Sequence, residues 1–545
     1  MATAPNGPHP DDLGAAYEAG LGKGVRQRQG AFYTPSDVAD GVVALAVADE
    51  ALAPPRQPTI CDPAAGGGAF LLAAARRLDA LGHSRRTILL DLLWGADIDP
   101  DAVAVARTAL RSWGAEEGAE LDPPHLVVAD PLALGASAWP DAPAAGFDVV
   151  VGNPPFLSPL GAATPRVAGH TRWLKGLAGA TGAPYADTAA IFLLLACELA
   201  GSAGRVAMIV PESVLGARDA AGVRDAMLAR AGLVGLWWGA EPIFDAGVQV
   251  CAPVLQMGLA QPDRCRLWQG RSFEAVSAVR VDRDGVAEGG SWGPLLARLR
   301  GAPDVHLGNG PALATRAVAT AGFREQFYGV APFVHETAGD ASPPLLAPLV
   351  TAGLIDPLRC RWGQADARFA GRRWTAPTVD LEALADADPT LASWARERRV
   401  PKVVVATQTR VVEAVVDLDG SWWPSVPTIA VTPTASGEEE LWKLAAVLTA
   451  PPVSAWALST YGGTALSGDA IKLSARQILA IPLPGDGECW ASGATEAQAA
   501  HLAALAGDAH GWRAALRRLG RAMTDAYGAS DEVLAWWEAR LPPWR

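Results

Sequence analysis

Four polar residues in the first third of the sequence each follow a short apolar run: Asp62, Asp97, Asp130 and Asn153. Short apolar runs closed by turn residues are typical of buried strands in a parallel sheet. Ligands of open α/β sheets bind outside the carboxyl ends of such strands, so the four side chains are candidates for one site. Carboxylate and amide groups can accept hydrogen bonds from a ligand there, or hold a cation. Chance accounts for one or two such positions, but hardly for four in order.

The run before Asn153 ends in the turn Gly152-Asn-Pro-Pro-Phe156. Pro154 and Pro155 restrict the backbone around the asparagine, which would hold a reacting group in a fixed position. Pro and Gly also end ordinary strands, so this stretch alone fits a plain strand-to-loop connection equally well. The neighbouring motifs decide between the two interpretations.

A glycine-rich turn, with Gly66, Gly67 and Gly68, follows Asp62 and precedes a predicted helix over 71–81. This strand, turn and helix begin the βαβ arrangement that binds nucleotide-like cofactors, because glycines let the backbone approach a ligand closely. A carboxylate beside the glycines would repel a pyrophosphate. It suits a cationic amino-acid group instead.

The end of the second predicted strand reads Gly95-Ala-Asp-Ile-Asp-Pro100. An acidic residue there is placed to accept hydrogen bonds from ribose hydroxyls, and we assign that role to Asp97. Ile98 would form an apolar wall for a base. Asp99 is predicted to cap the helix that Pro100 opens.

A further motif, Tyr33-Thr34-Pro35, precedes a predicted helix over 38–52, and an earlier short helix is expected near 11–19. Tyr33 and Thr34 either line a pocket or form a plain helix entry, since Ser36 and Asp37 are good helix-starting residues.

The composition is that of a folded globular protein, with 50% apolar and 19% charged residues in 545, enough for two to four domains. The formal net charge of −13 disfavours an extensive basic surface, so any nucleic-acid contact must come from a local patch.

Six dispersed cysteines predict neither a zinc site nor a disulfide framework, so we expect no metal and a reducing, cytoplasmic location. No signal peptide or membrane span is expected. The apolar segment 188–200, which contains Glu198, is predicted as a core helix.

Taken in order, the motifs between residues 33 and 156 resemble those of S-adenosylmethionine-dependent DNA adenine-N6 methyltransferases of the gamma motif order, the group containing TaqI methyltransferase. That family carries Tyr-Thr-Pro, Asp-Pro-x-x-Gly-x-Gly-x-Phe, acidic-Ile-Asp-Pro, an Asp-containing loop and Asn-Pro-Pro-Tyr/Phe. The resemblance implies cofactor contacts at Tyr33, Thr34, Asp62, Ala64, Gly66, Gly68, Asp97, Ile98, Asp130 and Pro131. Within this set Thr34 would contact the cofactor's amino-acid part, and Asp130 the exocyclic amine of its adenine.

The same resemblance implies a catalytic loop at Asn153, Pro154, Pro155 and Phe156. The amine of adenine is a poor nucleophile, and two acceptors aimed at its N–H groups favour the geometry in which its lone pair is available. The Asn153 side-chain oxygen and the Pro154 carbonyl would supply them. Phe156 and Phe244 would stack on a target base flipped out of the duplex. An aromatic beside two strands, such as Phe244, is also commonly a core residue.

The implied fold is a Rossmann-like α/β domain with a seven-stranded methyltransferase sheet, followed by a C-terminal mixed α/β target-recognition domain. The expected divisions are a loose segment at 1–25, the methyltransferase domain at 26–270, a connection at 271–320, the recognition domain at 321–490 and a helical segment at 491–545.

Basic residues interleaved with aromatics in the second half suggest a phosphate-tracking surface. The candidates are Arg372, Arg373, Arg398, Arg399, Lys402 and Arg410. Solvated arginines encoded by GC-rich DNA would look the same.

The predicted function is site-specific adenine-N6 methylation of double-stranded DNA in restriction-modification or phage defence, with defence-system proteins as further partners. Two alternatives stay open. The same core acts on RNA or on a protein glutamine amide in related enzymes, or it serves as a cofactor-binding scaffold subunit of a defence complex.

Overall fold

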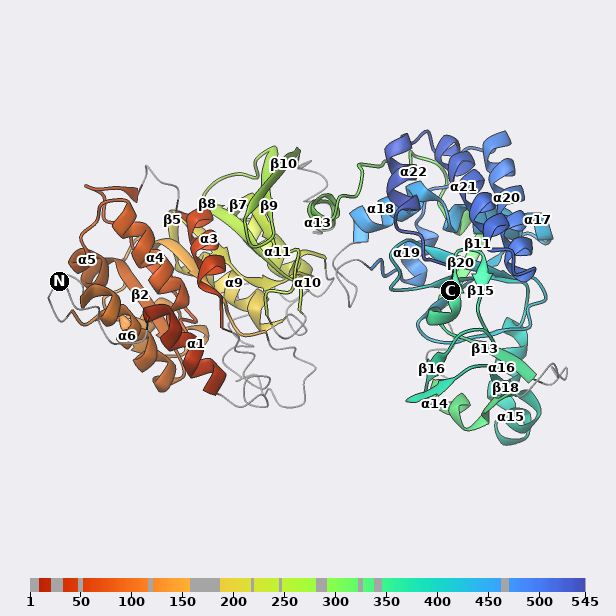
Figure 1. Ribbon diagram of the computed structural model, residues 1–545, viewed down its shortest axis with the longest axis horizontal. Coiled ribbons are helices and arrows are strands. Elements are labelled where there is room, and N and C mark those ends of the chain that lie inside the picture. The colour runs from red at the N-terminus through yellow and green to blue at the C-terminus, as the bar shows by residue number, and fades with distance from the viewer. Residues whose placement is uncertain are drawn as a thin grey trace. The chain divides into compact units, whose positions relative to one another are not determined.

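The computed structural model describes residues 9–20, 33–47, 52–115, 121–156, 187–216, 220–244, 248–280, 292–321, 327–337, 346–461 and 470–544. The chain divides into two units, Met1–Leu299 and Arg300–Arg545 (Figure 1). The division falls inside the segment that the sequence predicts as a connection.

The first unit is built on a ten-stranded mixed sheet in the order β10-β9-β7-β8-β5-β4-β1-β2-β3, with β6 paired to β8. The strands are β1 (Ile60–Asp62), β2 (Leu93–Asp97), β3 (Leu126–Val128), β4 (Phe147–Gly152), β5 (Ala200–Met208), β6 (Val210–Pro211), β7 (Ala231–Trp238), β8 (Val250–Met257), β9 (Arg264–Gln269) and β10 (Glu274–Arg280). Strands β3, β2, β1, β4 and β5 run parallel, whereas β8 is antiparallel to both β5 and β7.

The sheet is larger than the seven strands predicted. β6, β9 and β10 are the strands beyond the predicted seven. β9 pairs in parallel with β7 and forms a hairpin with β10, with Gly270 in the turn at φ +67°. This hairpin was not predicted from the sequence, because the Gly- and charge-rich sequence after 270 lacks the apolar runs of the central strands.

Successive residues of the central strands enter two separate cores, as a sheet covered on both faces requires. Ile60, Val149 and Val151 pack with α3 (Ser36–Ala46), α4 (Ala69–Ala80) and α6 (Pro100–Gly114). Cys61 and Val150 pack on the other face with α9 (Thr188–Leu199), α11 (Ala221–Leu228) and α13 (Gly293–Leu299). Other α-helices among the described residues of this unit are α1 (Pro10–Gly20), α5 (Arg85–Thr87), α7 (Pro131–Leu134) and α10 (Ser213–Gly216). The predicted helices near 11–19 and 71–81 are confirmed. The helix predicted over 38–52 is present but ends at Ala46, and residues 48–51 lie outside the described part of the chain.

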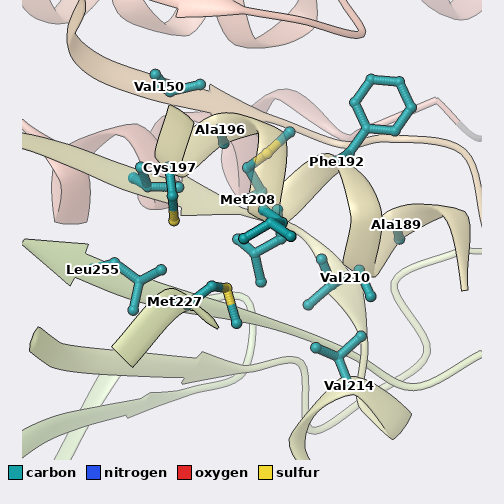
Figure 2. Packing of buried hydrophobic residues seen from close by; sticks show 14 of the residues in the cluster. Val150, Ala189, Phe192, Ala196, Cys197, Met208, Val210, Val214, Met227 and Leu255 are labelled. Carbon is teal, nitrogen blue, oxygen red and sulfur yellow. The ribbon is translucent and has the colours of Figure 1, made fainter. Parts of the chain in front are cut away.

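The second of these cores is seen in Figure 2, where Ala189, Phe192, Ala196 and Cys197 of α9 lie with Val150, Met208 and Leu255 of the sheet. Helix α9 is buried along almost its whole length, so the predicted core helix is confirmed. This packing fixes β4, whose carboxyl end carries Asn153.

The second unit contains two four-stranded sheets and two hairpins. The first sheet is antiparallel: β11 (Ala317–Ala321), β22 (Thr428–Pro433), β19 (Lys402–Ala406) and β20 (Glu413–Asp417). The second runs β12 (Val334–Glu336), β18 (Pro377–Asp380), β13 (Leu346–Val350) and β21 (Trp423–Pro424). The hairpins are β14 (Ile355–Asp356) with β15 (Arg359–Cys360), and β16 (Ala367–Phe369) with β17 (Arg372–Trp374).

Helices surround these sheets: α14 (Phe327–Val330), α15 (Leu381–Ala387), α16 (Pro389–Arg398), α17 (Glu438–Leu448), α18 (Pro451–Tyr461), α19 (Ala475–Leu479), α20 (Glu488–Leu505), α21 (Ala509–Ala526) and α22 (Asp531–Glu538). Trp536 and Trp537 of α22 are buried. No single helix in the described part of the chain is long and apolar enough to cross a membrane. Helices α17 and α18 together have the length and apolar composition of a membrane span, but the chain bends by 54° between them.

Candidate active site

A hydrogen bond links the loop after β4 to the loop before α3. Asn153 Nδ2 donates to Thr34 Oγ1 at 3.0 Å, and the Thr34 side chain is 4% exposed. With the amide nitrogen directed at Thr34, the amide oxygen Oδ1 is the atom that can accept from a ligand N–H. Thr34, predicted to contact a cofactor, therefore also orients Asn153.

We expect Thr34→Val to lower kcat about fivefold and to leave the KM for cofactor unchanged, because one neutral hydrogen bond is worth roughly 1 kcal/mol. Without its partner, the Asn153 amide can turn its nitrogen toward the ligand. Steady-state kinetics with Thr34→Ser as control checks this, since serine restores the hydroxyl. A raised KM with kcat preserved would instead assign Thr34 to the cofactor alone.

Gly152, at the end of β4, lies against Asp62 on the neighbouring strand. Its φ is +155°, and a Cβ at this position would lie 2.6 Å from Asp62 Oδ1. The Asp62 carboxylate thus occupies the space beside the Gly152 backbone and accepts a hydrogen bond from the Ala64 amide at 3.0 Å. Glycine is required here, because any side chain would displace the carboxylate.

Asp62 is 1% exposed. Burial raises its pKa to about 7, the nearby Asp97 adds to the rise, and the Ala64 amide opposes it. A carboxyl group in this state is close to half ionised at neutral pH, and a cation beside it would ionise it fully.

The glycine-rich turn is held to the end of β2. The Gly66 amide donates to Asp97 Oδ2 at 2.9 Å, and the Asp99 amide donates to Asp97 Oδ1 at 2.9 Å. Gly66 and Gly68 adopt φ of +50° and +90°, a region that favours glycine. These bonds lower the pKa of Asp97, but burial dominates and raises it above its usual value.

The ends of β2 and β3 present apolar and capping groups. Ile98 is 72% exposed, as expected of a surface that a base could cover. Asp99 accepts from the Asp101 amide at 3.0 Å and caps α6, which confirms the predicted cap. Asp130 accepts from the Leu132 amide at 3.0 Å at the start of α7, whose first residue is Pro131.

The two predicted base-stacking rings come together. The Phe156 and Phe244 ring centroids are 6.0 Å apart at an interplanar angle of 72°. Phe244 is buried and Phe156 half-buried, and both belong to the packing around the β4 end of the sheet.

A cavity of about 30 Å³ lies between these motifs. Its lining is Glu18, Tyr33, Thr34, Asp62, Ala64, Ala65, Gly66, Gly67, Ala69, Phe70 and Asn153. Sequence reasoning found most of this set but missed Glu18 of α1, which carries no motif signal of its own. No group of three or more His, Cys, Asp or Glu side chains suited to a metal occurs among the residues the structure describes.

The predicted basic residues of the second unit lie in three places: around two adjoining cavities, at the end of α16, and, for Lys402, in the interior of a sheet. Arg373 and Arg410 line a cavity of about 780 Å³, and Arg372 and Arg373 line a smaller one beside it. Arg398 lies over the Trp394 ring at 4.2 Å, on α16, and Arg399, just after the helix, is half-buried.

The prediction that Lys402 contacts DNA phosphate is wrong. It is 1% exposed, and its Nζ donates to Asp417 Oδ2 at 2.7 Å and to the Val400 carbonyl at 3.1 Å. Burial lowers the pKa of Lys402 despite the attraction of Asp417. The antiparallel register places Lys402 opposite Asp417, so the predicted phosphate contact is replaced by a buried ion pair.

The large cavity contains more arginines than the sequence suggested. Arg361, Arg368 and Arg540 join Arg373 and Arg410, against the acidic residues Asp356, Asp366 and Glu413. Burial raises the pKa of Glu413 to about 8, so it is mostly neutral at pH 7. We name this cavity the arginine groove. Its positive excess suits an anionic ligand.

The strand order and the polar strand ends of the first unit define a class of α/β proteins that bind a nucleotide-like cofactor at the carboxyl edge of the sheet. Residues 8–257 match the family described as N-6 DNA Methylase. The matched segment is somewhat less than half of the chain and includes most of the first unit.

Two further comparisons extend this result. The Type II methyltransferase M.VspI of Vibrio sp. (strain 343) is 26% identical over 223 residues, which cover 41% of this chain and 46% of the relative. The match thus spans about half the length of that curated relative.

Solved structures share the fold over more of the chain. The Type IIL restriction-modification enzyme MmeI, solved in complex with DNA, gives a TM-score of 0.61 at 14% identity, covering 98% of this chain and 81% of that one. The DrdV–DNA complex gives 0.56 at 14% identity, covering 90% of this chain and 60% of that one.

Proposed function

We propose that this chain is a site-specific DNA adenine-N6 methyltransferase that acts on a flipped-out adenine of duplex DNA, in restriction-modification or phage defence. The observation that carries the proposal is the pairing of Asn153 with Thr34 beside Asp62 at the end of β4. The match of residues 8–257 to the N-6 DNA Methylase family supports it.

S-adenosylmethionine is the proposed cofactor, and the residues present fit it. The turn at Gly66–Gly68 allows close backbone approach, the buried Asp62 suits a cationic amino-acid group, and Asp97 suits ribose hydroxyls. The exposed Ile98 would cover the adenine ring, with Tyr33, Ala64, Asp130 and Pro131 as further proposed contacts. When bound, the cofactor supplies an electrophilic methyl group.

The residues of the chain orient the acceptor amine. Asn153 Oδ1 and the Pro154 carbonyl would accept its two N–H groups, which favours the geometry with an available lone pair. Phe156 and Phe244 would stack on the base, and Pro154 and Pro155 limit the movement of the loop. A base inside a duplex cannot reach this loop, so the enzyme must extrude it.

The second unit is proposed as the target-recognition domain over 321–490, with the helical segment 491–545 packed behind it. The arginine groove supports this assignment, since its five arginines exceed its three acidic residues. Arg372, which lines the adjoining cavity, lies 4.7 Å from the Trp374 ring centroid. Basic and aromatic groups together suit a nucleic-acid backbone.

We expect the double variant Arg373→Gln/Arg410→Gln to weaken duplex DNA binding. The slope of log affinity against log salt should fall by about two, because each lost phosphate contact removes about 0.9. Fluorescence anisotropy at several salt concentrations measures this. Arg86→Gln is the matched control, because exposed Arg86 precedes β2 and lies at the opposite end of the strands from the site. An unchanged slope would exclude the groove as the DNA contact.

The deciding experiment compares wild type with Asn153→Ala, both expressed in a methylation-free host, by reading modified bases across the genome. N6-methyladenine confined to one sequence motif, and only with wild type, is the expected result. Modified RNA or modified protein glutamine, together with unmodified DNA, would show that RNA or protein and not DNA is the substrate. A wild type that modifies nothing would favour the scaffold alternative.

A further inference from the structure

Helix α1 docks on the glycine-rich turn through a contact between two glycines. A Cβ added to Gly67 would lie 2.7 Å from Gly14 Cα, so Gly67 needs to lack a side chain for the backbones to approach this closely. A Cβ added to Gly14 would be tight as well, at 3.2 Å from the Gly67 carbonyl oxygen. Helix α1 also packs against α6 and α4. It is the dark red helix of Figure 1.

Hydrogen bonds and ion pairs at both ends of α1 fix its rotation. The Tyr17 hydroxyl donates to Asp99 Oδ2 at 2.6 Å. At the other end, Arg76 Nη1 of α4 pairs with Asp11 Oδ1 at 2.9 Å, and the Tyr33 hydroxyl donates to the Asp11 carbonyl at 2.9 Å. Helix α1 is therefore held against three segments that carry proposed cofactor contacts.

This rotation brings Glu18 to the site. Gly14 and Glu18 are four residues apart and lie on the same helix face. Glu18 is half-buried, lines the cavity together with Thr34, Asp62 and Asn153, and its Oε1 is 3.8 Å from a Cβ built at Gly66.

The size and charge of this cavity suit an ammonium group. Its volume of about 30 Å³ encloses a head group and not a whole nucleoside cofactor. Two of its lining residues are carboxylic acids, Glu18 and Asp62, and the lining contains no lysine or arginine in the part of the chain described. Two carboxyl groups around so small a space favour a cation between them.

We propose that Glu18 is a second carboxylate for the ammonium group of the cofactor's amino-acid end, and that α1 forms one wall of the cofactor site. This inference rests on the proposed function. The family match begins at residue 8 and thus includes α1.

The test compares two ligands that differ in the amino-acid group. Isothermal titration of the full chain with S-adenosylmethionine and with 5′-methylthioadenosine, which lacks that group, is made for wild type and for Glu18→Gln. The variant should bind S-adenosylmethionine about 10- to 100-fold more weakly, the usual effect of losing a charge-assisted hydrogen bond, and 5′-methylthioadenosine equally well.

Asp12→Asn is the matched control, because Asp12 is an exposed acid on the same helix. It should leave both affinities unchanged. Equal binding of S-adenosylmethionine by wild type and Glu18→Gln would overturn this inference alone. Equal losses for both ligands would also overturn it, because they indicate a purely structural helix. A wild type that binds no S-adenosylmethionine would overturn the proposed function as well.

Discussion

Replacing Asn153 with alanine is expected to lower kcat for DNA methylation by about 10²- to 10³-fold, the usual effect of removing one hydrogen-bonding group that acts on the transition state. The cofactor affinity should stay within about twofold, because Asn153 donates to Thr34 and is proposed to face the target amine. Single-turnover kinetics with saturating cofactor measures the first quantity, and titration calorimetry the second.

Asn153→Asp serves as the companion variant. It keeps an oxygen acceptor and can accept a hydrogen bond from the Thr34 hydroxyl, so the partner at 3.0 Å is retained with its direction reversed. We expect an intermediate rate. If Asn153→Ala folds, binds cofactor and methylates at the wild-type rate, the amine-orienting role is wrong.

Cofactor affinity is expected to rise with pH between about 6 and 8, because the pKa of Asp62 is raised to about 7 by burial. Below that pH the carboxyl group is protonated and cannot pair with an ammonium group. Above it the group is ionised and binds the cation more tightly. Binding at pH 7 should therefore release about half a proton from Asp62. Calorimetry in buffers of different ionisation enthalpy measures this release.

Asp62→Asn removes the titrating group and should bind about 10- to 100-fold more weakly at pH 8, with a flatter pH dependence. Any slope that remains reports the neighbouring Asp97, whose pKa is also raised by burial. An unchanged slope in Asp62→Asn would show that Asp62 does not pair with the ligand.

The sequence predicted the strand ends of the first unit because their signals are local. A buried parallel strand shows its apolar run, and the polar residue after it must lie at the shared edge of the sheet. This logic placed Asp62, Asp97 and Asn153 correctly at the ends of their strands. The cap at Asp99 was equally predictable, because Asp-Pro at a helix start is a short-range pattern.

Features that depend on contacts distant in sequence were not predictable. Glu18 reaches the site only because Gly14 meets Gly67, and no local pattern links two glycines so far apart. The Lys402–Asp417 pair depends on strand register, which a basic residue before a valine run does not reveal. Arg361 and Arg540 line one groove although about a third of the chain separates them.

The short length of α1 has a thermodynamic consequence. An isolated helix of 11 residues is marginal in water, so α1 owes its helical state to docking on the glycine-rich turn. The segment is then either helical and docked, with the wall of the site complete, or undocked and not helical, with the wall missing. A ligand that contacts that wall must select the docked state, and its apparent dissociation constant is the intrinsic one divided by the docked fraction. Substitutions that weaken the docking contacts of α1, such as the bond from Tyr17 to Asp99, can thus lower cofactor affinity without touching the cofactor.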